Sequence, residues 1–308
     1  MSFTREVKDE LSKLSLDKLE CVSILSAILR NDGVIEDQTI KVQTENSSVA
    51  RYVFYLIKEL YNVTCKITVR RGYNYSKKYI YILEINKKVE IIKEDLCLNK
   101  NIPSEYIVSD DNLTRIYLRG VFLSCGSIND PKKSRYHLEF SVDNYEYAQF
   151  IKEKINIYDL NSKVIKRENC YMIYVKEAEK IGDFLRMINA ISALLYFEDI
   201  RIYRDHKNMT NRLNNCEQAN VDKIIETSNN QVKDIELIES VGGLDLLDEK
   251  VKLAAKYRLK YKDASLLELS QIMSIETGTK ITKSGIHHRF NKIKKMASVI
   301  RNKENEKK

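Results

Sequence analysis

The sequence is poor in residues that break or cross-link chains: its 308 residues include no tryptophan, 2 prolines, 9 glycines and 6 cysteines. With so little proline and glycine, we expect the junctions between domains to be helical or tight rather than long and flexible. The cysteines are scattered, form no CxxC pair and have no clustered histidines beside them. This pattern argues against a zinc site or a disulfide framework, so no cofactor is expected.

Long hydrophobic runs are also missing. No apolar stretch approaches the roughly 18 residues needed to cross a bilayer, and the charged, amphipathic N-terminus does not resemble a signal peptide. We therefore expect a cytoplasmic protein with no membrane partner. The hydrophobic fraction of 43% is enough for real cores, and the length suits two or three domains. The net charge of +8 is compatible with a polyanionic partner but does not require one.

The first two hundred residues contain an internal duplication. Residues 25–35 are echoed by residues 118–128, and each copy ends in Gly-x-Ile. Each copy continues into an alternating stretch, at 39–44 and 136–142, which is typical of a half-buried strand. A helical pattern follows each strand, and then a hairpin pattern that closes on another helix. The hairpins and closing helices are predicted at 65–71 turning near 72–74 to 79–85, then 89–96, and at 163–166 turning near 168–169 to 171–175, then 178–188.

Two αββαββα-like halves of this kind should pack as one pseudo-symmetric α+β unit. The pattern resembles the LAGLIDADG homing-endonuclease fold. That resemblance implies two motif helices packed closely at a pseudo-dyad through small residues, which Ser26, Ala27 and Gly120 would supply here. It also implies an acidic metal ligand before the last glycine of each motif, because paired metals must hold both oxygens of a phosphodiester.

The two motif positions disagree. The first copy has Asp32 before its glycine, whereas the second has Cys125. One carboxylate cannot assemble a symmetric metal site, so we expect a retired nuclease scaffold with no catalytic residue and no metal, in which Asp32 is a vestigial candidate. The alternative for Asp32 is that it simply ends a helix. Basic residues near the first hairpin are candidates for auxiliary contacts with DNA or a protein, or else serve solubility: Arg70, Arg71, Lys77 and Lys78.

The last hundred residues have a different, helical pattern. Residues 211–220 are polar and lead into apolar positions at helical spacing over 221–239, which predicts a connecting helix. A glycine pair at 242–243 precedes a second predicted helix over 244–261. Two interpretations of 211–220 stay open. Its side chains, with Asn211 and Arg212 as auxiliary candidates, contact DNA or another domain, or its asparagines satisfy backbone amides at a helix start.

A helix-turn-helix is predicted between about Ser265 and Ser298. Ser265 and Glu268 form a capping-box pattern, Gly278 marks the turn, and Thr282 is placed to cap a final helix over 283–300. From residue 277 to 303 there are eight basic residues and no acidic one. Binding of such a basic helix to phosphates is favourable because counterions are released. The second helix of a helix-turn-helix lies in the major groove, where phosphates are close to it.

Roles within this motif follow from position along the last helix. Residues near its start are best placed for base edges, and those further along for phosphates; a merely solvated basic helix is the alternative. The candidate DNA-binding residues are Lys280, Lys283, Ser284, His287, His288, Arg289, Asn291, Lys292, Lys294 and Lys295.

With both parts assembled, the chain resembles the WhiA family essentially end to end. The most specific segments are Asn-Arg-Leu-Asn-Asn-Cys-Glu-Gln-Ala-Asn at 211–220 and Lys-Ser-Gly-Ile-His-His-Arg at 283–289. The resemblance implies a DNA-binding protein tied to cell division, chromosome segregation and sporulation gene control, without nuclease activity. It also implies a last domain similar to the promoter-reading region of sigma factors. Asp32 is a departure, because an acid at that position is not expected in this family.

The resulting expectation is a non-enzymatic, nucleoid-associated transcription regulator that binds double-stranded DNA. Its expected parts are the two LAGLIDADG-like halves at 1–100 and 101–203, a helical linker at 204–243 and the helix-turn-helix domain at 244–308. Two alternatives remain: a metal-dependent DNA endonuclease that uses Asp32, and a module that binds transcription or cell-division proteins. Since the duplication already supplies a pseudo-dyad, a monomer is expected.

Overall fold

The computed structural model describes residues 2–36, 38–71, 79–133 and 135–305. The chain divides into two compact units, Met1–Asp205 and His206–Lys308. Among the helices of the described residues, none combines the length and the apolar character that a membrane span requires. The predicted turn of the first hairpin, together with Lys77 and Lys78, lies outside the described residues.

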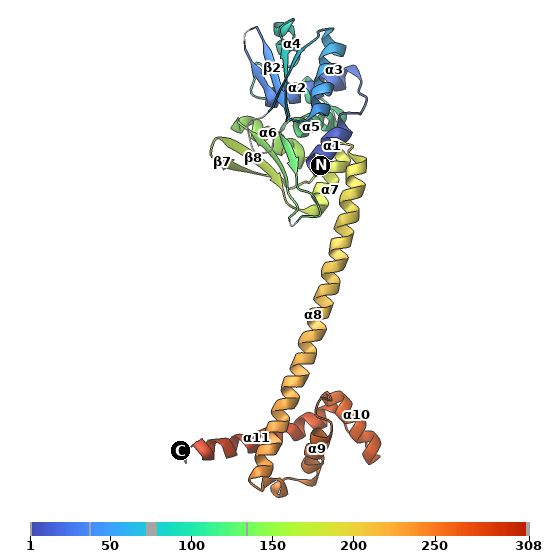
Figure 1. Cartoon of the computed structure of the whole chain (residues 1–308), viewed down its shortest axis with the longest axis vertical. Coiled ribbons are helices and arrows are strands. Elements are labelled where there is room, and N and C mark those ends of the chain that lie inside the picture. Colours follow the sequence, from blue (N-terminus) through green and yellow to red (C-terminus); the bar gives the residue numbers. More distant parts are fainter. Residues whose placement is uncertain (1, 37, 72–78, 134, 306–308) are drawn as a thin grey trace. The chain divides into compact units, whose positions relative to one another are not determined.

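The first unit contains the predicted duplication (Figure 1). Each half runs helix, two strands, helix, two strands, helix, and its four strands form one antiparallel sheet, in the order β1-β2-β4-β3 or β5-β6-β8-β7. The first half comprises α2 Lys18–Asp32, β1 Gly33–Ile35, β2 Ile40–Thr44, α3 Ser47–Tyr61, β3 Lys66–Arg71, β4 Tyr79–Ile85 and α4 Val89–Asp95. The second comprises α5 Asp111–Cys125, β5 Gly126–Ile128, β6 Leu138–Val142, α6 Tyr145–Asn156, β7 Lys163–Arg167, β8 Cys170–Val175 and α7 Ala178–Met187.

Strand alternation decides which face of each sheet enters the core. In the first sheet Val42 pairs with Leu83, and in the second Phe140 pairs with Ile173; all four side chains are fully buried. Neighbouring residues on each strand point to the opposite face, as the period of two requires. The core of the unit therefore lies between the sheets and the helices that cover them.

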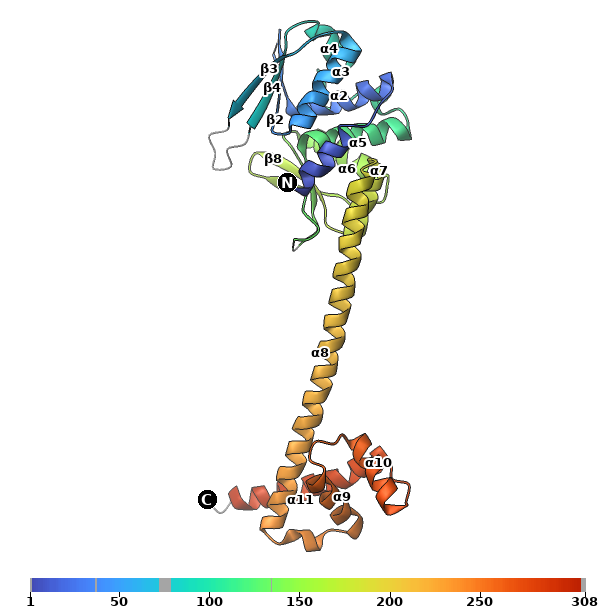
Figure 2. The ribbon, with the colours of Figure 1, turned by 45° about the vertical axis from the view of Figure 1, so that its right-hand side comes forward.

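The two motif helices α2 and α5 lie side by side in the first unit (Figure 2). Their close approach depends on Gly120, because a Cβ atom there would meet the Ile24 carbonyl oxygen at 2.6 Å and the Ala27 Cβ at 2.7 Å. Ser26 is fully buried and donates to the carbonyl of Leu96 at 2.8 Å. Of the three small residues predicted to allow this contact, Ala27 and Gly120 lie between the two helices, and Ser26 is buried against Leu96.

A further helix, α1 Phe3–Leu11, precedes the duplication and was not singled out in the sequence. Its Phe3, Val7 and Leu11 side chains are buried in the same core. The Thr4 hydroxyl donates to the Ile128 carbonyl at 2.8 Å and accepts from the Ile128 amide at 2.9 Å. These contacts fix α1 against strand β5 of the second half.

Helix α8 Ile191–Ser240 begins in the first unit and ends in the second. Residues 211–220 lie in its interior, so the interpretation of this segment as a helix start is wrong. The segment is rich in asparagine, which favours helix ends, but it contains no glycine, proline or β-branched residue to interrupt the helix.

The second unit continues with η2 Gly243–Leu246, α9 Glu249–Lys260, α10 Leu266–Thr277 and α11 Lys283–Asn305. The helix predicted over 244–261 is therefore shorter than expected. Its first residues form a 3-10 turn after Gly242, which has a positive φ of 67°, and the α-helix starts only after Asp248.

Arg258 is a buried cation whose contacts connect several elements of the second unit. Its side chain is 1% exposed and donates to Gln231 Oε1 at 2.9 Å and to the carbonyls of Tyr261 and Ala264. Its guanidinium also lies 5.4 Å from the centre of the Phe290 ring. One buried cation thereby connects the end of α8, the loop between α9 and α10, and α11.

Candidate nucleic-acid interface

The helix pair α10–α11 has the local geometry of a helix-turn-helix. The Ser265 hydroxyl accepts from the Glu268 amide at 3.2 Å, and the Glu268 carboxylate accepts from the Ser265 amide at 2.7 Å, so the predicted capping box is confirmed. Gly278 ends α10 with a φ of 68°, in the left-handed region that suits glycine. The Thr282 hydroxyl accepts from the Gly285 amide at 3.1 Å and caps α11, as predicted.

Helix α11 buries one narrow face. Ile286, Phe290, Ile293 and Ala297 are each at most 3% exposed and pack with Leu269 and Met273 of α10 in the core of this unit. Their four-three-four spacing leaves the opposite face to solvent. The exposed candidates are Lys280, Lys283, Ser284, His287, His288, Asn291, Lys292, Lys294 and Lys295.

Two predicted contact residues have surroundings that the sequence did not indicate. Lys292 Nζ lies 3.0 Å from a carboxylate oxygen of Asp248, so an acid from the start of α9 already neutralises one cation of this face. Arg289 is half-buried, and its Nη1 has no hydrogen-bond partner within the described part of the chain. Both side chains line a groove of about 720 Å³ between α9 and α11.

The auxiliary candidates are separate from this face. Asn211 and Arg212 are exposed on α8. Arg70 and Arg71 are exposed on β3, where they pair with Ile80 and Tyr79 and so point to opposite faces of the sheet. The two arginines therefore do not form one basic cluster on a sheet face.

The ends of α2 and α5 do not fit the paired metals that a LAGLIDADG nuclease needs. Burial raises the pKa of the Asp32 carboxyl to about 6, against an opposing effect of the nearby Lys8. Burial, helped by Asp32, raises the pKa of the Cys125 thiol to about 12, so this thiol is uncharged near neutral pH and does not replace a carboxylate. The two positions thus supply one acid, beside a lysine rather than a second acid.

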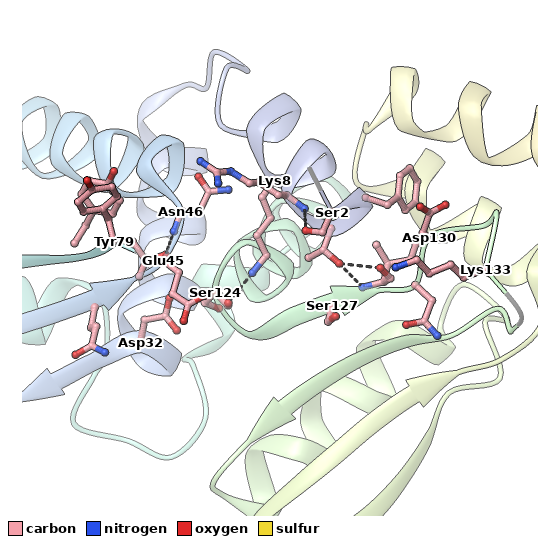
Figure 3. A pocket seen from close by; sticks show the side chains of 18 residues that line it. Ser2, Lys8, Asp32, Glu45, Asn46, Tyr79, Ser124, Ser127, Asp130 and Lys133 are labelled. Atoms are coloured by element: carbon pink, nitrogen blue, oxygen red, sulfur yellow. Dashed lines mark hydrogen bonds between the residues drawn. The ribbon is translucent and has the colours of Figure 1, made fainter. Parts of the chain in front are cut away.

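Sequence reasoning missed Lys8 altogether. Its side chain reaches from α1 to the end of α5, where Nζ donates to the Ser124 carbonyl at 2.9 Å (Figure 3). No local pattern signals this contact, because it joins positions 116 apart. Within the part of the chain that is described, no group of three or more histidine, cysteine or acidic residues is arranged to hold a metal ion.

Family models match three consecutive parts of the chain. A model described as the WhiA N-terminal LAGLIDADG-like domain matches residues 22–98. One described as the WhiA LAGLIDADG-like domain matches residues 114–207, and one described as the WhiA C-terminal HTH domain matches residues 210–297. The last match includes the asparagine-rich segment within α8.

Relatives match over nearly their whole length. A protein of Bacillus cytotoxicus named "Probable cell division protein WhiA" is 41% identical over 312 residues, which cover 98% of each chain. A protein of the same name from Staphylococcus aureus strain NCTC 8325 is 39% identical, with 99% of each chain covered.

Two solved structures have the same fold. The crystal structure of full-length DUF199/WhiA from Thermatoga maritima is 26% identical, with a TM-score of 0.60 and coverage of 97% of this chain and 98% of that one. The structure of the N-terminal LAGLIDADG domain of DUF199/WhiA matches with 23% identity and a TM-score of 0.50, covering 61% of this chain and 90% of that one.

Proposed function

The chain belongs to the WhiA family, and from that premise we propose that it is a regulator of cell division that binds double-stranded DNA through helices α10 and α11. The observation that carries the proposal is the outward face of α11, on which seven exposed candidates gather between 284 and 295, in a stretch of the helix from 283 to 303 that contains no acidic residue. Positively charged side chains that lie close together repel one another in water. When they bind the phosphate backbone of DNA, they release the counterions condensed on the DNA, and this release favours binding.

The position of each residue on α11 suggests its role. Lys283, Ser284 and His287 lie in the first turn and a half, the part of a recognition helix that reaches base edges. Lys294 and Lys295 lie further along and are suited to phosphates, which orient the domain without reading sequence. Binding should therefore combine a large salt-dependent part with a smaller sequence-dependent part.

In this proposal the first unit is a non-catalytic scaffold. The support is the disagreement between Asp32 and Cys125 together with the lysine beside them. We further propose that the protein acts in the nucleoid as a monomer, regulating transcription in chromosome segregation and, where the lineage sporulates, in sporulation. The LAGLIDADG-like halves at 1–100 and 101–203, the helical linker at 204–243 and the helix-turn-helix domain at 244–308 would then have separate tasks.

The test is DNA binding by the full chain at two salt concentrations, with duplexes from its own division-gene promoters and scrambled versions of them. We expect tighter binding to the promoters and a strong loss of affinity with salt. The Lys292→Glu/Lys295→Glu variant should lose at least about tenfold in affinity and reduce the salt slope by about 2.

The matched control is Lys233→Glu/Lys256→Glu, which makes the same change of charge at exposed positions of α8 and α9 in the same unit. It should retain most of the affinity. Equal losses in both double variants would mean that net charge, and not the α11 face, attracts DNA. Absence of binding by the native chain would favour the alternative in which the protein is a module that binds division or transcription proteins.

A further inference from the structure

A cavity of about 840 Å³, lined mainly by polar and charged residues, lies in the first unit where the two halves meet. It is lined by the start of α1, the ends of α2 and α5, and the segments after β2 and β5 (Figure 3). Asp32 is among the lining residues, at the position where the resemblance to LAGLIDADG nucleases implies an acid. The charged side chains that line it are Arg5, Lys8, Asp32, Glu45, Asp130 and Lys133.

Among these groups, Lys8 has the closest relation to the two motif helices. Its Nζ donates to the Ser124 carbonyl, one residue before Cys125, and lies 5.9 Å from the centre of the Phe122 ring. Burial lowers the pKa of the Lys8 ammonium, and the nearby charge of Asp32 opposes this effect. The ammonium group is thus hydrogen-bonded at the end of α5 and shares its cavity with Asp32 at the end of α2.

We propose that Lys8 is a built-in cation that has taken the place of the nuclease metal, and that it excludes divalent ions from Asp32. A divalent ion needs oxygen ligands in its first shell, yet here the second motif offers a neutral thiol and the lysine already occupies the Ser124 carbonyl. An ammonium group that lines the same cavity as Asp32 repels an incoming divalent cation and offsets part of the charge of that carboxylate.

Hydrogen bonds and core contacts fix the position of α1, and with it the position of the Lys8 backbone. The Ser2 hydroxyl caps α1, and Thr4 is bonded twice to Ile128. The Phe3 ring stacks on Phe197 at 6.3 Å between centres. Because Phe3 and Val7 are buried in the core, the backbone of α1 is held in place at Lys8. The inference rests on the non-catalytic role proposed for the first unit and deepens it, and it holds whether or not α11 binds DNA.

The first test measures Mn²⁺ binding by the full chain with electron paramagnetic resonance. The Lys8→Ala variant should bind Mn²⁺ at least tenfold more tightly than the native chain, and Lys8→Ala/Asp32→Asn should lose that gain. The control is Arg5→Ala, which removes a cation from the same helix and cavity but not from the ends of α2 and α5. Equal affinity of Lys8→Ala and the native chain, including no binding by either, would overturn the proposal.

The second test asks whether Lys8 and Asp32 interact, without reference to metal. Lys8→Met should lower the Tm of the first unit by at least about 2 °C more in the native background than in Asp32→Asn, because the pair is coupled only when both charges are present. Lys8→Arg keeps the cation and should lose less than Lys8→Met. The same loss in both backgrounds would contradict the assigned role.

Discussion

Buried cations of the first unit and the exposed cations of α11 in the second unit are placed in opposite ways. In the first unit Lys8 turns inward to the ends of the motif helices, and Arg119, which is 5% exposed, donates to the Ile188 carbonyl. In the second unit the cations of α11 point outward, and Asp248 neutralises one of them. Inward cations are satisfied by the fold itself, whereas outward ones are solvated and are available to a polyanion. Structural roles therefore suit the first set, and binding roles suit the second.

The largest effect should come from breaking the second unit while the first stays folded. Phe290→Ala removes a ring that is 3% exposed and lies under the Arg258 guanidinium. It should cost about 3–5 kcal/mol in the stability of this unit. Differential scanning calorimetry should then resolve an early transition for the second unit and an unchanged later one for the first. Phe290→Leu is the milder control, and a single shifted transition would contradict independent units.

The converse change breaks the first unit. Gly120→Ala places a Cβ against the backbone of α2, at 2.6 Å from the Ile24 oxygen, and should cost about 1–3 kcal/mol. The affinity of the full chain for DNA should stay within twofold of the native value. Ser124→Ala, one turn further on the same helix, is the control and should be nearly neutral. If Gly120→Ala abolished DNA binding at a temperature where the protein is folded, the separation of roles would be wrong.

The stability of the first unit should depend on pH through the half-buried carboxyl group of Asp32. Because the folded pKa of Asp32 is about 6 and its ordinary value is 3.8, the folded state keeps a proton that the unfolded chain has lost. This contribution to stability is complete below about pH 4 and is lost as the pH rises to 6. Asp32→Asn should therefore gain stability relative to the native chain between pH 4 and pH 7. The gain should be about 1–2 kcal/mol, allowing for solvent at this half-buried carboxylate. Chemical denaturation at the two pH values measures it, and a constant difference would contradict the shift.

The smallest effect concerns Lys292, an outward cation of α11 that has an internal partner. Asp248→Asn frees Lys292 and should tighten DNA binding by about two- to fivefold at low salt, since an exposed ion pair of this kind contributes about 0.2–1 kcal/mol. Fluorescence anisotropy with the promoter duplex measures the change. Asp245→Asn removes an acid of the same segment that faces Lys252 instead, and should have less effect. A weaker complex in Asp248→Asn would mean that Asp248 itself takes part in recognition.

Local patterns were sufficient to predict the strands from β2 to β4 and from β6 to β8, the caps and the buried face of α11, whereas the short strands β1 and β5 were not placed. The alternation over 136–142 and the Ser265–Glu268 capping box are decided by neighbours in sequence, so they could be read directly. Three features could not. Residues 211–220 are helical because they continue into the later turns of α8. The α-helix α9 starts late because the backbone at Gly242 has a positive φ. The position of the Lys8 side chain is set by its contact with Ser124, which is distant in sequence.

The buried contacts of Arg258 predict how mutant alleles of this protein should behave. Its guanidinium satisfies the carbonyls of Tyr261 and Ala264 in the interior of the second unit, and lysine has neither the reach nor the fork of donors to replace it. Alleles that change Arg258 should therefore behave as nulls or as temperature-sensitive alleles, with low protein levels on an immunoblot. Alleles that change the outward face of α11 should accumulate as stable protein and, when overproduced, should not compete with the wild-type protein for the DNA that we propose it binds.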